Sequence, residues 1–176
     1  MSFDLQPVLE DDRVRLRPMR DEDFDDLFSV ASDPLIWEQH PASDRYTPDV
    51  FREFFDGGMA SGGAFVILDR QTGAMIGASR YNGFDPTARS VEIGWTFLAR
   101  SHWGGPWNAA VKRLMLDHAF RFVDRVVLFA GEENHRSRRA IKKIGGVEAG
   151  VRTGKDGRRD IRYHVERPAG RAGQAQ

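Results

Sequence analysis

The chain has no cysteine among its 176 residues, and this absence excludes several kinds of site. A disulfide scaffold, a metal site with thiolate ligands and a catalytic cysteine all require sulfhydryl groups. No Gly-x-Ser-x-Gly motif is present, which argues against serine hydrolase chemistry. We also expect no metal site, because no His-Glu-x-x-His spacing links the histidines, which are His40, His102, His118, His135 and His164.

A net charge and a long apolar run are missing as well. The 26 basic residues equal the 26 acidic ones, which argues against a protein held on nucleic acid or on a membrane by bulk electrostatics. No apolar run approaches the roughly 20 residues of a membrane-spanning helix. The acidic start, MSFDLQPVLEDD, lacks the apolar core of a signal peptide. We therefore expect a cytoplasmic protein with neither a nucleic-acid nor a membrane partner.

The composition that is present is that of a globular protein, with 40% hydrophobic residues and 18 glycines. A chain of this length normally forms one domain. We expect that domain to span 1–167. The remaining segment, 168–176, is rich in glycine, alanine, glutamine and arginine, and is expected to be a flexible tail.

Strand-like and helix-like patterns alternate along the domain. Period-two alternation or a short apolar run predicts strands, and apolar residues at spacings of three and four predict helices. The third helix has the clearest amphipathic pattern, with His118 on its apolar face, and Gly57-Gly58 is the expected end of the second. The order is mixed α/β with one parallel crossover, around the third helix. The predicted strands are 14–18, 64–68, 74–81, 91–98, 126–130, 147–152 and 158–165, and the predicted helices are 21–31, 47–58, 104–122 and 135–144.

The junction between the fourth strand and the third helix is the most informative segment, with the sequence Ser-His-Trp-Gly-Gly-Pro-Trp-Asn from Ser101 to Asn108. A glycine-rich turn at a helix N-terminus exposes unpaired N–H groups and the positive end of the helix dipole, which favours a phosphate. No Gly-Lys-Ser/Thr follows, so the turn is not a Walker A loop, and its spacing is not that of a dinucleotide-binding fingerprint. A simple tight turn is the alternative interpretation.

Three motifs in this order resemble the GNAT superfamily of acetyl-CoA-dependent N-acetyltransferases. They are Val91-Glu92-Ile93-Gly94-Trp95, then His102-Trp103-Gly104-Gly105, then Asn134-His135-Arg136-Ser137 with Lys143-Ile144-Gly145. The branch that contains the ribosomal-protein N-terminal acetyltransferases is the most similar. The resemblance extends from Val14 to Val165 and implies the GNAT fold, a mixed, mostly antiparallel central sheet flanked by about four helices.

The resemblance also implies roles for individual residues. The turn from Gly104 to Asn108 would hold the pyrophosphate of coenzyme A, and the backbone from Trp95 to Leu98 would pair with the pantetheine arm. Two positions depart from the family pattern, because Pro106 removes one N–H donor and Gly146 replaces an aromatic residue. The implied cofactor-binding residues are Trp95, Thr96, Phe97, Leu98, His102, Trp103, Gly104, Gly105, Trp107, Asn108, Asn134, Ser137 and Arg139.

Amine acetylation needs a neutral amine, whereas an α-amine titrates near 8 and a lysine near 10.4. A carboxylate acting through a water molecule can take the proton, and Glu92 is the candidate base. Ser137 is the candidate acid for the departing thiolate. A solvated or ion-paired surface glutamate is the alternative for Glu92, and a helix cap is a second, compatible role for Asn134.

The acceptor side of the site is less defined. The segment that joins the first two predicted helices and the end of one strand supply four candidate acceptor-binding residues, Trp37, His40, Tyr81 and Asn82. The acceptor amine would be a protein N-terminus or a small molecule. Two chains would pair as a homodimer, as is common in this fold.

Two other functions compete with the enzyme. The first is a catalytically silent module that binds coenzyme A, for which Pro106 is the evidence. The second is nucleic-acid binding by a basic hairpin without interleaved aromatics, formed around Arg152, Lys155, Arg158, Arg159 and Arg162.

Overall fold

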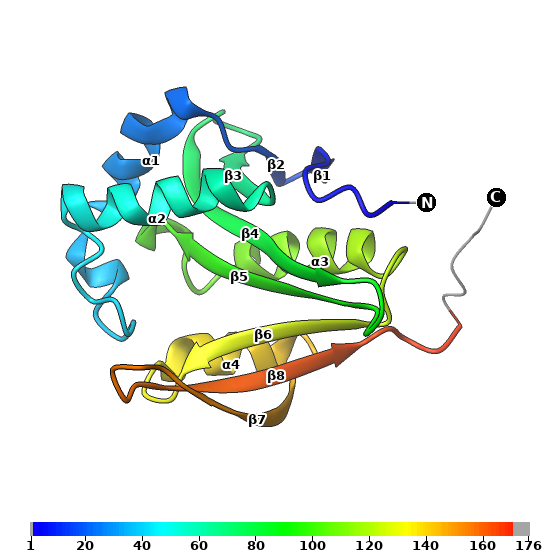
Figure 1. Ribbon diagram of the computed structural model, residues 1–176. Helices are drawn as coiled ribbons and strands as arrows, with labels where there is room; N and C mark the ends of the chain where they lie inside the picture. The colour runs from blue at the N-terminus through cyan, green and yellow to red at the C-terminus, as the bar shows by residue number, and fades with distance from the viewer. Residues whose placement is uncertain (1, 171–176) are drawn as a thin grey trace.

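A computed structural model describes residues 2–170, which form one sheet in the strand order β1-β2-β3-β4-β5-β6-β8-β7, with helices on both faces (Figure 1). Most of the predicted tail, 171–176, lies outside the described residues. The elements in this part of the chain are the strands β1 (Leu9–Glu10), β2 (Val14–Pro18), β3 (Ala64–Asp69), β4 (Met75–Asp85), β5 (Ser90–Leu98), β6 (Arg125–Gly131), β7 (Val147–Thr153) and β8 (Arg159–Glu166), the helices α1 (Phe24–Ala31), α2 (Pro48–Ser61), α3 (Trp107–Ala119) and α4 (His135–Lys143), and the 3-10 helices η1 (Asp21–Asp23), η2 (Pro34–Ile36) and η3 (Arg100–His102).

The predicted mixed α/β order and the mostly antiparallel sheet are confirmed. Strands β5 and β6 are the parallel pair, and α3 is the crossover between them. They pair only from Ser90–Glu92 to Arg125–Val127 and then separate. The sequence predicts every strand except the two-residue β1, which lies at the edge of the sheet.

Each face of the sheet has its own apolar core. Helices α3 and α4 cover one face, where Met115 and Ile141 pack with Ile93 of β5. Helices α1 and α2 cover the other, where Leu27 and Phe51 pack with Phe97 of β5. Strand β5 therefore contributes side chains to both cores, which fixes it from two sides.

Two expectations about the helices have different outcomes. His118 is 8% exposed in the core beside α3, as predicted, and its Nε2 lies 2.8 Å from the carbonyl oxygen of Asp4. The predicted end of α2 at Gly57-Gly58 is wrong, since the helix continues to Ser61 and ends at Gly62, which has a left-handed φ of 66°. A Cβ at Gly58 would lie 3.3 Å from that of Ala64, so close packing against β3 requires this glycine within the helix.

Candidate active site

A cleft of about 920 Å³ opens where β5 and β6 separate. Its first wall consists of β5 and α3, and its second consists of β6, α4 and the β7–β8 hairpin. The segment between η2 and α2 lies along one end, with Trp37, His40, Pro41 and Arg45 among the lining residues. The separation of two parallel strands thus creates space for a ligand without opening either core.

The glycine-rich turn lies at one end of this cleft and leads into α3. Gly104 has a φ of 70°, and a Cβ built there meets nothing within 4 Å, so backbone conformation rather than crowding favours glycine. Pro106 is the N-cap residue of α3, and its carbonyl accepts the N–H of Ala110. The other N–H groups of the first helical turn have no partner one turn earlier in the helix, and groups of this kind can bind an anion.

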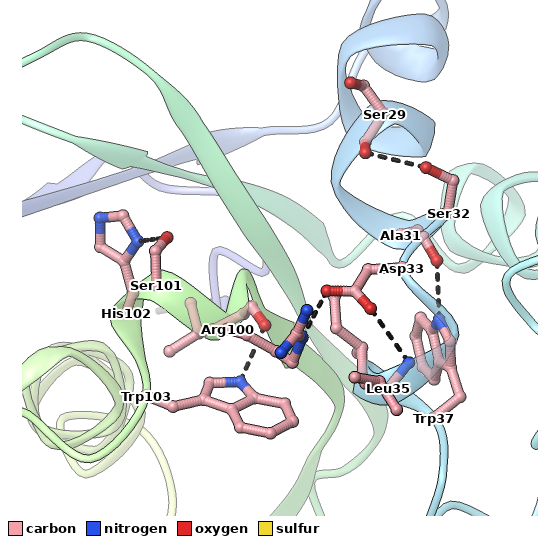
Figure 2. Close-up of polar contacts among 12 residues, drawn as sticks. Ser29, Ala31, Ser32, Asp33, Leu35, Trp37, Arg100, Ser101, His102 and Trp103 are labelled. Carbon is pink, nitrogen blue, oxygen red and sulfur yellow. Dashed lines mark hydrogen bonds and ion pairs between the residues drawn. The ribbon is translucent and has the colours of Figure 1, made fainter.

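Side chains around η3 hold this turn in place. Trp103 donates its indole N–H to the carbonyl of Leu98 at 2.9 Å. Figure 2 shows Arg100 directed at Asp33, with which it forms an ion pair of 2.5 Å. Nδ1 of His102 forms a hydrogen bond of 2.8 Å with the Ser101 hydroxyl, and Nε2 of the same ring lies 3.3 Å from an oxygen of Asp69. The turn is therefore tied both to the end of β5 and to the start of η2.

Trp107 and His102 pack against each other with ring centroids 4.6 Å apart. The Arg13 guanidinium lies 5.3 Å from the Trp107 ring, and Trp107 is not among the residues that line the cleft. A cofactor contact by the Trp107 side chain, expected from the sequence, is therefore not supported, whereas its backbone still belongs to the first turn of α3.

Strand β5 bulges in the middle of the first wall. Trp95 has a left-handed φ of 51°, and the register with β4 shifts between Ala78 and Arg80. The Arg80 guanidinium lies 4.2 Å from the centre of the Trp95 ring, which supports this strained residue. The bulge thus lies at the start of Trp95–Leu98, the segment expected to pair with the pantetheine arm, and all four of these residues line the cleft.

Glu92 lies at the closed end of the cleft, at the last residue that β5 pairs with β6. Burial raises the pKa of its carboxyl above the ordinary value, while Arg152, a hydrogen bond from Asn82 and Arg80 oppose this rise. A carboxyl with a raised pKa is suited to accept a proton near neutral pH. The sequence predicted that Asn82 binds the acceptor. In the structure its side chain forms a hydrogen bond to Glu92 instead, and Asn82 is not among the residues that line the cleft.

Asn134 and Ser137 lie opposite β5, at the start of α4. Asn134 is 6% exposed and caps the helix, since its Oδ1 accepts the backbone N–H of Ser137 at 3.1 Å. Both residues line the cleft, as does Arg139. The capping role expected from the sequence is confirmed, and it leaves the Asn134 amide N–H₂ and the Ser137 hydroxyl for other contacts.

The acceptor end contains Trp37 and His40. Trp37 is 2% exposed and donates its indole N–H to Ala31 at 2.8 Å. Burial, with added repulsion from Arg45, lowers the pKa of His40 to about 3, and its Nδ1 accepts the N–H of Ala42. His40 is therefore neutral at physiological pH and presents an uncharged ring to this end of the cleft.

The prediction that Tyr81 contacts the acceptor is wrong. Its side chain is fully buried on the α3 face of the sheet, where its hydroxyl donates to the carbonyl of Met115. Period-two alternation along β4 explains the error, because Tyr81 points to the face opposite Arg80 and Asn82.

Sequence reasoning missed Lys112 of α3, which lines the cleft and is 5% exposed. Its Nζ donates to Oγ1 of Thr96, and burial alone lowers its pKa to about 7. The signal was available, because Lys112 lies one helical turn after Asn108 and must share its side of the helix.

The β7–β8 hairpin is less cationic than its sequence suggests, since Arg152 pairs with Asp160 at 2.9 Å and Arg158 with Asp156 at 3.2 Å. No group of three or more His, Asp or Glu residues within 2–170 is arranged to hold a metal ion, and no helix there is long and apolar enough to cross a membrane.

The cleft brings together most residues predicted for the site. The predicted residues that line it are Trp37, His40, Glu92, Trp95, Thr96, Phe97, Leu98, His102, Trp103, Gly104, Gly105, Asn108, Asn134, Ser137 and Arg139.

Comparison with known proteins agrees with this architecture. A family model described as an acetyltransferase (GNAT) domain matches residues 13–147. Among solved structures, a GCN5-related N-acetyltransferase from Brucella melitensis has a TM-score of 0.76 at 22% identity, with 92% of this chain and 79% of that chain covered. RimJ from Mycobacterium smegmatis, in complex with CoA-disulfide, has a TM-score of 0.69 at 24% identity, with 87% and 81% covered.

A third structure is the Salmonella typhimurium acetyl transferase that modifies the N-terminal serine of ribosomal protein L7/L12. It has a TM-score of 0.77 at 16% identity, with 92% of this chain and 100% of that chain covered. The family match and these structures confirm the expected family and fold. The chain belongs to the GNAT family of acetyl-CoA-dependent N-acetyltransferases.

Proposed function

We propose that the protein transfers the acetyl group of acetyl-CoA to the primary amine of a protein N-terminus or a small molecule, by direct attack in a ternary complex. One observation carries this proposal: a single cleft contains Glu92, the bulged segment of β5, the turn before α3, and Asn134 and Ser137. Much of the acceleration would come from aligning the two substrates there.

The chain's own residues suit coenzyme A. The N–H groups at the start of α3 and the open backbone at Gly104 suit a pyrophosphate, and the segment Trp95–Leu98, which lines the cleft, would lie along a pantetheine arm. Asn134 and Arg139 would add polar contacts from α4. The bound coenzyme supplies an activated acetyl thioester.

Glu92 would act as the base through a water molecule. An α-amine with a pKa near 8 is protonated for most of the time at neutral pH, and only its neutral form attacks. The carboxylate of Glu92 takes that proton, and its raised pKa brings base and amine closer in proton affinity. Neutral His40 and buried Trp37 would form part of the acceptor end and add no positive charge to that of Arg45.

The alternative is a module that binds coenzyme A without catalysis. Pro106 is the specific observation in its favour, because it stands at the N-cap of α3 and has no N–H for a phosphate. The two functions differ in turnover, not in binding. A cytoplasmic location and pairing of two chains are further proposals that do not depend on this choice.

The first experiment is thermal unfolding with acetyl-CoA, coenzyme A, ATP and NAD at matched concentrations. A ligand at 100 times its Kd stabilises the folded state by about 2.7 kcal/mol, which raises Tm by roughly 5–11 °C in a domain of this size. We expect this shift with both coenzyme A species and with neither ATP nor NAD. A panel of N-terminal peptides, polyamines and amino acids, assayed for thiol release, then tests turnover. Binding without thiol release on any amine would favour the silent module.

A further inference from the structure

Lys112 is a buried amine whose role in the site is unassigned. It lies on the cleft side of α3, is 5% exposed, and donates a hydrogen bond from Nζ to Oγ1 of Thr96. That hydroxyl in turn lies 2.8 Å from Oγ of Ser79. Lys112 is thus held by a short chain of hydroxyl groups at the bulge of β5.

The burial of this amine is not balanced by a carboxylate. Among the described residues Lys112 makes no ion pair, and an ammonium has two N–H donors left after one hydrogen bond to Thr96. A buried charge without a partner is costly, so a lysine with a purely structural role would normally be replaced by an apolar residue of similar shape. Lys112 therefore points to a ligand that occupies the cleft.

The position of Lys112 along the cleft indicates which part of that ligand it would contact. Pairing between β5 and β6 ends at Glu92 and Val127, and Thr96 and Gly131 each lie four residues beyond it. Asn134 and Ser137 follow directly after Gly131 and line the same cleft. Lys112 and Ser137 therefore approach one level of the cleft from opposite walls.

We propose that Lys112 is the general acid of the acetyl transfer and gives its proton to the sulfur of coenzyme A as the thiolate departs. This inference rests on the proposed function, because it requires the thioester to lie between Thr96 and Ser137. It replaces the expectation that Ser137 is the acid. A serine hydroxyl is a far weaker acid than a thiol, whereas an amine that titrates near 7 is well matched to a thiolate with a pKa of about 8.5.

The proton balance of the step is complete. Glu92 first takes one proton from the acceptor ammonium through water, and the neutral nitrogen bonds to the carbonyl carbon. Lys112 gives its proton to the sulfur while the carbon–sulfur bond breaks. The nitrogen loses its second proton to solvent as the amide forms. Glu92 then releases its proton to solvent and Lys112 regains one, so that one proton is released for each acetyl group transferred.

The groups that face Lys112 leave its titration under the control of burial. Thr96 on β5 and Ser79 on β4 present neutral hydroxyls, and β6 carries no charged residue after Arg125. His102 in the turn, together with Arg139 and Lys143 of α4, lines the same cleft, but none of the three contributes to the pKa of Lys112. An anion arriving in the cleft would favour the ammonium form.

The decisive variant is Lys112→Met, with Lys142→Met as its matched control. Lys142 undergoes the same chemical change on the outer side of α4, where it pairs with Glu148 at 3.1 Å. Loss of a general acid should lower kcat by about 100-fold or more, with a smaller change in KM for acetyl-CoA. We expect Lys112→Met to abolish the alkaline limb of the kcat profile and to leave Tm without ligand unchanged or raised, and Lys142→Met to behave as wild type.

A second measurement is independent of turnover. The thiol pKa of bound coenzyme A, followed by thiolate absorbance, should be lower in the wild type than in Lys112→Met by about one unit, because a thiolate and an ammonium in contact stabilise each other's charged forms. Equal thiol pKa values, or an unchanged kcat, would overturn the proposal. A fall in Tm without ligand would assign Lys112 a structural role. If wild type releases no thiol with any amine, the proposed function fails, while the thiol titration still decides whether Lys112 contacts the sulfur.

Discussion

The two walls of the cleft are stabilised in different ways. The inner wall, β5 with α3, lies between two apolar cores, and residues such as Val91, Ile93 and Met115 are at most 1% exposed. The outer wall consists of β6, α4 and the β7–β8 hairpin, and its last strand, β7, is an edge strand in which every residue is exposed. Glu148 of β7 pairs with Arg138 and Lys142 of α4, both at 3.1 Å, and surface pairs of this kind contribute about 0–1 kcal/mol each.

The inner wall is the more constrained of the two. Glu92, Lys112 and the bulge at Trp95 all belong to the inner wall, whose backbone cannot move without disturbing a core. The β7–β8 hairpin contributes Arg152 and Arg158 to the outer wall through exposed pairs. The inner wall is suited to hold reacting atoms, and the outer wall is suited to change with the acceptor.

The largest effect is expected from Gly77→Ala in β4, at the position that pairs with Leu98 of the inner wall. A Cβ at Gly77 would overlap the carbonyl oxygen of Phe97 and lie 3.1 Å from Cα of Leu98, so the backbones of β4 and β5 would have to part. Overpacking against backbone should lower the free energy of unfolding by about 3 kcal/mol or more. Urea denaturation of the purified variant measures it.

Gly57→Ala is the matched control for this substitution. A Cβ at Gly57 in α2 would lie 3.9 Å from the Arg80 guanidinium, an ordinary contact. Alanine is also favoured over glycine within a helix by roughly 0.5–1 kcal/mol. This variant should be as stable as wild type or more so. Equal losses in both variants would show that the inner wall is no more constrained than α2.

Glu92→Gln should have the next largest effect, on rate rather than on folding. Removal of a general base should lower kcat by about 100-fold or more, equivalent to roughly 2.7 kcal/mol in the barrier. The raised pKa of Glu92 means that wild-type activity falls on acidification at a pH above the ordinary carboxyl range, and the glutamine variant should lack this acidic limb. Initial rates across pH 5–9 test both points.

The raised pKa of Glu92 also predicts the direction in which Glu92→Gln changes the free energy of unfolding. A raised pKa means that folding favours the protonated carboxyl, and this contribution is lost as pH rises through the folded-state pKa. Glutamine remains neutral, so the variant should be at least as stable as wild type at pH 8. Preserved kcat with an unaltered acidic limb would exclude Glu92 as the base.

Much of the fold could be predicted because periodicity reports local burial. The alternation in β5 and the apolar run in β6 gave the parallel pair, and the Gly104 turn followed from its position before α3. Periodicity could also have placed Lys112 and Tyr81 on the correct faces, but it could not have identified their partners. The partners of both, Thr96 and Met115, depend on which face of a strand meets which face of a helix, and a bulge at Trp95 reverses that assignment locally.

The smallest effect should come from Val151→Ser on the outer wall. Val151 is 43% exposed on the edge strand, so this change should alter the free energy of unfolding by no more than about 0.5 kcal/mol. The same change at fully buried Val126 of β6 should cost several times more, about 2–3 kcal/mol. If two chains pair through β7, serine at 151 would instead weaken the dimer, and sedimentation at micromolar concentration would show dissociation. An unchanged sedimentation profile together with an unchanged stability would leave β7 as a free edge, available to change without cost to the inner wall.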